Sequence, residues 1–223
     1  MLQLAICHLP TYFGTNPDRQ TIERHAALLP EEFRIRLLER RHIPSLLQSL
    51  GGMLLLRQLL GGEEFDRLAP TIQHDKNGRP YIPDVNIDFN IAHSDDWAVC
   101  AMETDVPEPR VGIDLQAVPK TRNMDKIAKR FFTPNEYDYF SAHHDRLHAF
   151  LRVWTRKEAL VKWKGVKLSV NIRKLDGFLD AERECVAFDE YIIGDSYMLT
   201  LCHRRSSRAP EQHEFIWMVA PEE

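Results

Sequence analysis

Glu158 is the residue of this sequence whose type and position most suggest chemistry. It lies in a predicted helix from about Asp145 to Lys164. With Leu147 at zero and about 100° added per residue, Glu158 falls at about 20°, in the middle of an apolar stripe. The stripe contains Leu147, Phe150, Leu151, Trp154 and Val161, whereas Arg152 and Arg156 are predicted to face solvent. A carboxylate on a core-facing stripe costs free energy unless it is paired, protonated or bound to a metal.

Lys162 follows Glu158 by one helical turn and lies at the edge of the same stripe. On an exposed helix the two residues would form an ordinary i,i+4 ion pair, worth roughly 0.2–0.5 kcal/mol. Because Glu158 is centred on the apolar stripe, we favour a functional carboxylate over that surface pair.

A second candidate is the predicted strand from Arg110 to Gln116. Side chains alternate along a strand, so Gly112, Asp114 and Gln116 share one face, and the bare glycine leaves room for something to approach. An exposed, solvated strand face is the alternative explanation. Oxygen ligands from Asp114 and Glu158, completed by water and a substrate phosphate, would suit Mg²⁺.

His93 ends a third predicted strand, where it could bind phosphate or merely cap a turn. Arginines are frequent on an early helix, and Arg79 lies in a predicted turn. Helical arginines usually face solvent, although some could form an anion pocket. The early arginines are Arg34, Arg36, Arg40 and Arg41.

The elements that would position these residues are a mixture of helices and strands. Strands are predicted from alternating apolar residues over residues 2–7, 87–92, 97–102 and 110–116, and further short strands at 178, 185–188, 191–193, 197–202 and 215–219. Helices are predicted over 31–41, 44–60 and 145–164. Thr133, Pro134 and Glu136 form a capping-box signature for another helix. Gly51 and Gly52 lower the helix propensity of the second helix, which is tolerable if a neighbouring backbone passes close by.

Length and composition limit the class of protein. The chain has 223 residues, 29 Lys and Arg against 33 Asp and Glu, and a formal net charge of −4. With 43% hydrophobic and 28% charged residues, a collagen-like, coiled-coil or disordered chain is excluded. The slight acidity argues against nucleic-acid binding, and no apolar run approaches a membrane span or a signal peptide. Four scattered cysteines suit reduced thiols in the cytoplasm better than disulfides or a zinc site.

Known nucleotide and hydrolase motifs are missing from the sequence. We find no P-loop, dinucleotide-binding glycine fingerprint, His-Glu-x-x-His or Gly-x-Ser-x-Gly. The segment Pro107–Pro109 is the best linker candidate, and helices and strands occur on both sides of it. We therefore expect an α+β fold in two halves, 1–108 and 109–223.

Five short motifs, in order, resemble one family. They are Gly78-Arg79-Pro80-Tyr81-Ile82-Pro83, Asn90-Ile91-Ala92-His93-Ser94, Gly112-Ile113-Asp114, Phe131-Phe132-Thr133-Pro134-Asn135-Glu136, and Trp154-Thr155-Arg156-Lys157-Glu158-Ala159-Leu160-Val161-Lys162. Together they resemble the 4′-phosphopantetheinyl transferases of the surfactin-synthetase-activating type, in the subgroup with a W-x-x-K-E-A motif. The matched blocks run from about residue 30 to 170, and the last 50 or so residues carry no motif of use.

The resemblance implies an activity and a fold. Such enzymes transfer the phosphopantetheine arm of coenzyme A to a serine of an apo acyl or peptidyl carrier protein and release adenosine 3′,5′-bisphosphate, with Mg²⁺ as cofactor. Their fold is a pseudo-dimer of two similar α+β halves with the active site in the cleft between them. The first half would contact the nucleotide of coenzyme A, and the second would hold the metal and the catalytic helix. We expect a cytoplasmic monomer that binds neither nucleic acid nor membrane.

The resemblance also implies roles for single residues. Asp114 and Glu158 are similar to the Mg²⁺ ligands, and Lys162 and His93 to the residues that contact the phosphates of coenzyme A. Glu158, or a water that it orients, would also be the base that takes the proton of the serine. Arg79 stands near the expected adenine, and Arg34, Arg36 and Arg41 are candidates for the 3′-phosphate. The basic-plus-apolar patch for the carrier would include Lys164, Lys167, Phe131 and Phe132.

Two positions depart from the family pattern. Gln116 replaces a second acid, so its amide oxygen could ligate Mg²⁺ but would bring no charge. Ala92 replaces a serine of the nucleotide pocket. Gln116 is therefore the feature that favours an alternative, a non-catalytic module that binds carrier proteins or coenzyme A. A further alternative, an unrelated Mg²⁺-dependent phosphoryl-transfer enzyme, would not need His93 or the 131–136 block.

Overall fold

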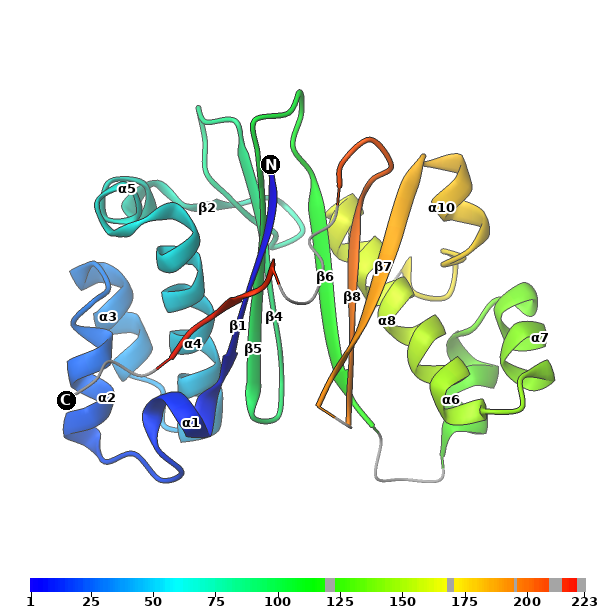
Figure 1. Ribbon diagram of the computed structural model, residues 1–223, viewed down its shortest axis with the longest axis horizontal. Helices are drawn as coiled ribbons and strands as arrows, with labels where there is room; N and C mark the ends of the chain where they lie inside the picture. Colours follow the sequence, from blue (N-terminus) through cyan, green and yellow to red (C-terminus); the bar gives the residue numbers. More distant parts are fainter. Residues whose placement is uncertain (119–122, 168–170, 195, 209–213, 220–223) are drawn as a thin grey trace. The chain divides into compact units, whose positions relative to one another are not determined.

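The computed structural model describes residues 1–118, 123–167, 171–194, 196–208 and 214–219 (Figure 1). By its internal contacts the chain divides into two compact units. The first comprises Met1–Gln73, Pro80–Pro109 and the C-terminal segment that carries strand β9, and the second comprises His74–Arg79 and the chain from Arg110 onward through β8. Helices and sheets occur in both units, which confirms the predicted α+β class.

The first unit contains a four-stranded sheet in the order β4-β5-β1-β9. Its strands are β4 (Ile87–Ser94), β5 (Trp97–Thr104), β1 (Leu2–His8) and β9 (Ile216–Trp217). The pairs β4–β5 and β1–β5 are antiparallel, whereas β9 runs parallel to β1. Strand β4 is longer than predicted because its pairing with β5 continues to Ser94, which lies opposite Trp97, and Asp95 (φ 45°) makes the tight turn. A separate two-stranded ladder joins β2 (Gln73–His74) to β3 (Pro80–Tyr81).

The helices of the first unit pack around a core of leucine side chains. They are α1 (Leu9–Phe13), α2 (Arg19–Ala26), α3 (Glu31–Leu38), α4 (Ile43–Leu60), α5 (Gly62–Leu68) and the 3₁₀ turn η1 (Ala69–Thr71). Helix α4, in the predicted place, lies against the sheet. A Cβ at Gly51 would come within 2.6 Å of the Leu9 side chain, and one at Gly52 within 2.6 Å of the Ile91 side chain. The groups that leave no room for a Cβ at these glycines are therefore side chains and not the expected backbone.

The second unit contains a three-stranded antiparallel sheet in the order β6-β8-β7. Its strands are β6 (Val111–Ala117), β8 (Tyr197–Arg204) and β7 (Val186–Ile193). Two separate short strands were predicted where β7 is one continuous strand, because its middle residues also pair with β8, Asp189 with Leu201 and Glu190 with Thr200. The strand predicted at Phe178 is wrong, since Phe178 caps a short helix.

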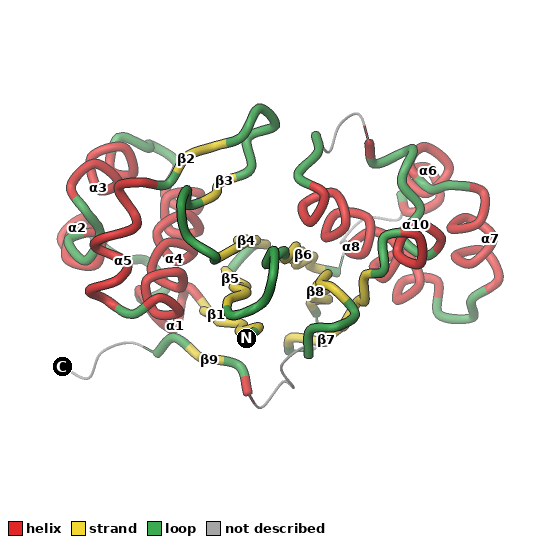
Figure 2. Tube along the Cα trace, turned by 90° about the horizontal axis from the view of Figure 1, so that it is seen from above, coloured by secondary structure: helices red, strands yellow, loops and turns green. Residues whose placement is uncertain are grey.

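The helices of the second unit are α6 (Met124–Phe131), α7 (Pro134–Ala142), α8 (Arg146–Lys164) and α10 (Leu179–Arg183). Figure 2 shows α8 alongside the sheet of this unit, with α7 and α10 further from it. The predicted capping box is present: the Thr133 hydroxyl accepts from the Glu136 N–H, and the Glu136 carboxylate accepts from the Thr133 N–H. Helix α8 begins after the capping residue Asp145 and ends at Gly165, whose left-handed conformation (φ 65°) suits glycine.

Helix α8 is buried on more than the single stripe that the sequence suggested. It packs on β6 and β8 and also on α6 and α7. Thr155 and Lys157 are fully buried, and the predicted solvent position of Arg156 is wrong, because its side chain is only 14% exposed and pairs with Glu190. Its guanidinium also lies over the rings of Phe178 and Phe188. A helix covered from two sides has two buried faces, which a single-stripe projection does not represent.

None of the helices formed by the described residues is long and apolar enough to cross a membrane. All four cysteines are free thiols. Cys7, Cys100 and Cys202 are buried, and Cys185 is exposed. This arrangement agrees with the expectation of free, mostly buried thiols.

Candidate functional site

The candidate site lies where β6 meets α8, and Gly112 brings the two elements together. A Cβ at Gly112 would lie 2.2 Å from the Ala159 carbonyl oxygen and 2.6 Å from the Trp163 backbone nitrogen. The sequence predicted that something approaches this glycine closely. In the structure it is the backbone of α8. Because side chains alternate along β6, the face that carries Gly112 also turns Asp114 and Gln116 toward the helix.

Asp114 and Lys162 form the centre of the site. Lys162 Nζ donates to Asp114 Oδ1 at 2.7 Å and to the Ile113 carbonyl oxygen at 2.9 Å. The Asp114 side chain is 6% exposed and the Lys162 side chain 28%. The ion-pair partner of Lys162 is thus Asp114 on the sheet, which excludes the simple surface pair between Lys162 and Glu158.

Glu158 faces the same place from α8. Burial, together with the negative charge of the neighbouring Asp114, raises the pKa of its carboxyl to about 7. The charge of Lys162 and a hydrogen bond from the Trp154 side chain act in the opposite direction. A raised pKa beside a second acid indicates two carboxyl groups crowded into one poorly solvated place.

The donor atoms suit a divalent cation. Asp114 Oδ2 is buried and has no hydrogen-bond partner among the described residues. A buried carboxylate oxygen without a partner is costly, and a cation shared with Glu158 would relieve both this cost and the repulsion between the two acids. Within the described ranges, no group of three His, Cys, Asp or Glu side chains is placed to hold a metal. The third protein oxygen near the pair would therefore come from the amide of Gln116, which is half-buried on the same face of β6.

Arg79 is held against the end of α8. Its side chain is buried, and its guanidinium donates to the carbonyl oxygens of Lys162 and, at 2.9 Å, of Val111. In the same turn, Asn77 Nδ2 donates to the Gly165 carbonyl oxygen at 2.7 Å. The turn signal at residues 75–80 was visible in the sequence, but its attachment to α8 and β6 was not.

The other predicted site residues belong to the first unit. His93 is exposed near the end of β4. Arg34 lies on α3, 3.8 Å from Glu31, and Arg36 and Arg41 are exposed on and just after the same helix. The structure thus brings Asp114, Glu158, Lys162 and the backbone contacts of Arg79 together within the second unit.

Sequence reasoning missed one residue next to the site. Lys157 immediately precedes Glu158, is fully buried, and forms an ion pair with the equally buried Glu136 of the capping box. A lysine that lies outside the predicted apolar stripe gives little sign of burial. The available signal was that Glu136 and Lys157 both occur within the recognised motifs.

Comparison with known proteins places this chain in a family. Residues 110–214 match the model of the 4′-phosphopantetheinyl transferase superfamily. A putative 4′-phosphopantetheinyl transferase of Haemophilus influenzae is 38% identical over 128 residues, which cover 56% of this chain and 54% of that protein. A 4′-phosphopantetheinyl transferase of Bacillus subtilis is 32% identical over 166 residues, which cover 69% and 71%. The L-aminoadipate-semialdehyde dehydrogenase-phosphopantetheinyl transferase of the mouse is 31% identical over 145 residues, which cover 57% and 45%.

This chain is a mixed α+β protein with two acids and a lysine on adjoining elements. It is similar to 4′-phosphopantetheinyl transferases over most of its length. The chain belongs to the 4′-phosphopantetheinyl transferase family. This confirms the enzyme class predicted from the sequence. The match spans about half the length of the Haemophilus relative and about two thirds of the Bacillus one.

Proposed function

We propose that the protein transfers the 4′-phosphopantetheine moiety of coenzyme A to a serine of an apo acyl or peptidyl carrier protein and releases adenosine 3′,5′-bisphosphate. The observation that carries this proposal is the cluster of Asp114, Glu158 and Lys162 at the junction of β6 and α8. Membership of the transferase family supports it, as do the names of the relatives from Haemophilus and Bacillus.

Asp114, Glu158 and the amide oxygen of Gln116 would hold Mg²⁺ in this proposal. When bound, the ion supplies positive charge to the pyrophosphate of coenzyme A. The buried, partnerless Asp114 Oδ2 and the neighbouring Glu158 carboxyl are the features that fit it. Because Gln116 carries no charge, we expect weaker metal binding than an aspartate or glutamate would give there.

Lys162 binds a phosphate oxygen of coenzyme A. An ammonium group has three N–H donors, and Asp114 Oδ1 and the Ile113 carbonyl oxygen take two of them. The third can donate to an anion at the exposed side of the lysine. Its charge would then stabilise the negative charge that develops as the pyrophosphate bond breaks.

Glu158 accepts the proton of the attacking serine hydroxyl at a carboxylate oxygen, directly or through a water that it orients. Asp114 would thus bind both Lys162 and the cation, and Glu158 would bind the cation and act as the base.

The first unit would contribute the nucleotide contacts. His93 would bind phosphate, and Arg34, Arg36 and Arg41 are the candidates for the 3′-phosphate. Arg79 would act near the adenine by holding its turn in place, because two of its guanidinium nitrogens are already bonded to backbone carbonyls. We also propose that the two units are related halves of a pseudo-dimer. In support, each unit packs a long helix, α4 or α8, against an antiparallel strand pair through glycines.

A non-catalytic module that binds carrier proteins or coenzyme A is the second candidate, favoured by the neutral Gln116. One experiment separates the two. The protein is incubated with coenzyme A, Mg²⁺ and several apo carrier proteins, and the carriers are analysed by mass spectrometry. A gain of one phosphopantetheine group is the expected result, and no gain on any carrier would favour the binding module.

A further inference from the structure

Lys157 is completely buried although it precedes the proposed catalytic carboxylate in the chain. Its Nζ donates to Glu136 Oε2 and to the Leu175 carbonyl oxygen. Lysine side chains are almost never fully buried unless they are paired. Glu136, which is also fully buried, is the partner of Lys157.

Glu136 joins three segments of the second unit. Its Oε2 accepts from the Thr133 N–H at 2.8 Å at the start of α7, and its Oε1 accepts from the Gly177 N–H at 2.7 Å in the segment before α10. Lys157 of α8 completes the set. Burial raises the pKa of the Glu136 carboxyl, and the charge of Lys157 opposes that rise.

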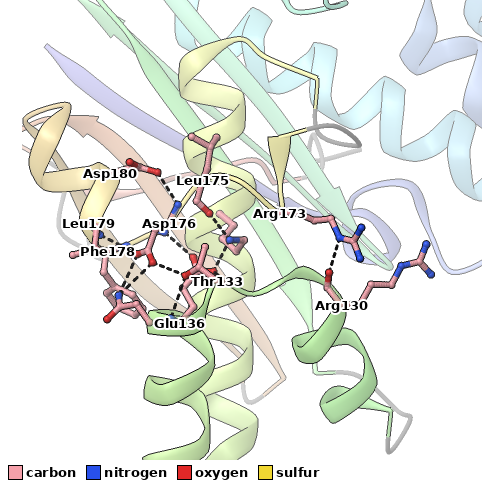
Figure 3. A network of polar contacts seen from close by, with 12 residues as sticks. Arg130, Thr133, Glu136, Arg173, Leu175, Asp176, Phe178, Leu179 and Asp180 are labelled. Atoms are coloured by element: carbon pink, nitrogen blue, oxygen red, sulfur yellow. Dashed lines mark hydrogen bonds and ion pairs between the residues drawn. The ribbon is translucent and has the colours of Figure 1, made fainter.

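The neighbouring segment is fixed by a second set of hydrogen bonds (Figure 3). Asp176 accepts from the Thr133 hydroxyl and, at 2.9 Å each, from the N–H groups of Phe178 and Leu179. The partner of Lys157 is therefore held in a network whose other members cannot easily shift. Lys157 connects α8 to that network.

Stability is a poor explanation for this ion pair. Two charges lose their hydration on burial, and replacing a buried pair by uncharged residues of similar volume is often neutral or stabilising. A pair that contributes little net stability can still select one arrangement of the elements it joins. Here those elements are α7, α8 and the segment at 175–177.

The arrangement of these elements matters for Glu158 because Lys157 and Glu158 are consecutive in the chain. Adjacent side chains on a helix point about 100° apart, so fixing Lys157 toward α7 leaves Glu158 directed toward Asp114 on β6. A helix rotation of roughly 10° would move a carboxylate about 6 Å from the helix axis by about 1 Å. We propose that the Lys157–Glu136 ion pair is the positioning pair of the site, which sets the rotation of α8 and thereby the place of the Glu158 carboxylate.

This inference rests on the proposed transferase function, and its test uses a double variant that removes both charges. Lys157→Met with Glu136→Gln keeps the volume, but the amide oxygen can accept from only one of the Thr133 and Gly177 N–H groups, and the Leu175 carbonyl oxygen loses its donor. We therefore expect a lower thermal midpoint. Measured well below that midpoint, the variant should have an unchanged KM for coenzyme A and a kcat about 100-fold lower, the loss associated with a misplacement of about 1 Å.

The matched control is Arg146→Met with Asp125→Asn. It likewise removes both charges of an ion pair on the same helix, but in a more exposed place. We expect wild-type kcat and KM from this variant. A drop in kcat as large as that of the buried pair would show that any lost charge on α8 has this effect, and would overturn the inference.

A second measurement does not depend on turnover. Trp154 lies one helical turn before Glu158 on α8, so its indole N–H resonance in an ¹H–¹⁵N spectrum is sensitive to where that carboxylate lies. We expect the resonance to move in the buried-pair variant and to stay in place in the control. Glu158→Gln identifies the signal and its sensitivity. If the double variant fails to fold, Lys157→Gln, which retains an N–H donor, takes its place.

The outcomes separate the two proposals. If the wild type modifies no carrier, the proposed function fails, but the Trp154 resonance still tests the positioning role. An unmoved resonance together with wild-type kcat overturns that role. So does a kcat loss that merely follows a loss of folded protein.

Discussion

The close approach of β6 and α8 at Gly112 makes a prediction that links packing to catalysis. In Gly112→Ala the new Cβ would lie 2.2 Å from the Ala159 carbonyl oxygen. An ordinary carbon–oxygen separation of about 3.3 Å requires strand and helix to move apart by about 1 Å. The two nearest atoms belong to the helix backbone and the third is the Cβ of Trp163, so no side-chain rotation can relieve the contact.

That displacement acts on stability and on the site. Overpacking of this kind costs about 1–3 kcal/mol, and the backbone contact puts Gly112→Ala near the upper end. At about 2–4 °C per kcal/mol for a chain of this size, the thermal midpoint should fall by roughly 6–12 °C. The Lys162–Asp114 hydrogen bond, now 2.7 Å, would lengthen to about 3.7 Å, beyond bonding distance. We expect a kcat about 100-fold lower.

Calorimetry and the carrier-modification assay, both run below the midpoint of the variant, measure these two effects. Gly194→Ala is the control, because Gly194 has φ 56° and nothing within 4 Å of a new Cβ. It should lose about 1–2 kcal/mol of stability from its left-handed backbone and keep full transfer. A Gly112→Ala protein with the wild-type midpoint and rate would refute the packing described for β6 and α8.

Three further predictions concern the carboxylates and their neighbours. Asp114→Asn and Glu158→Gln should each abolish carrier modification while circular dichroism stays unchanged, whereas the exposed Glu182→Gln should be fully active; near-normal transfer by either site variant would contradict the metal assignment. Gln116→Glu should remain active and reach half-maximal rate at a lower Mg²⁺ concentration, and a complete loss of activity would show that Gln116 does not stand in for an acid. Burial of Asp176 raises its pKa, but hydrogen bonds from Thr133, Leu179, Phe178 and Asn135 outweigh burial, so its folded-state pKa is lowered. Its stabilisation should therefore be complete above the unfolded pKa of about 3.9 and disappear as the pH falls through the lower folded value; urea unfolding of wild type and Asp176→Asn should converge at acid pH, and a constant gap from pH 7 to pH 2 would be the contrary result.

Local signals in the sequence predicted the two longest helices and the main strands, whereas the shorter helices α1, α2, α5 and α6 were not predicted. The capping box at Thr133 and Glu136 and the strand alternation of residues 111–116 both act within a few residues of the chain. Such signals depend on backbone hydrogen bonding and side-chain periodicity, which a short segment determines largely by itself. They are the reason that α4, α8, β1, β5 and β6 lie where the patterns indicated.

Two predictions were wrong because the burial of the residues concerned depends on contacts with a second layer of structure. Arg156 was expected in solvent, but α10 and β7 provide Phe178, Phe188 and Glu190 to cover it. The strand predicted at Phe178 is the start of a helix for a similar reason, since Asp176 caps the turn there. Hydrophobic periodicity reports one buried face, and it cannot show contacts with elements far along the chain.

For the candidate site, the sequence by itself determined which residues carry the chemistry. The motifs around Asp114, Glu158 and Lys162 identified the acids, the lysine and the family. Only the tertiary structure decided how they are used. It placed Lys162 on Asp114, left Asp114 Oδ2 buried without a partner, filled the space at Gly112 with the helix backbone, and buried Lys157 against Glu136. These are contacts between residues 20 to about 50 positions apart, and they follow from the packing of whole elements, which no local pattern of residue types records.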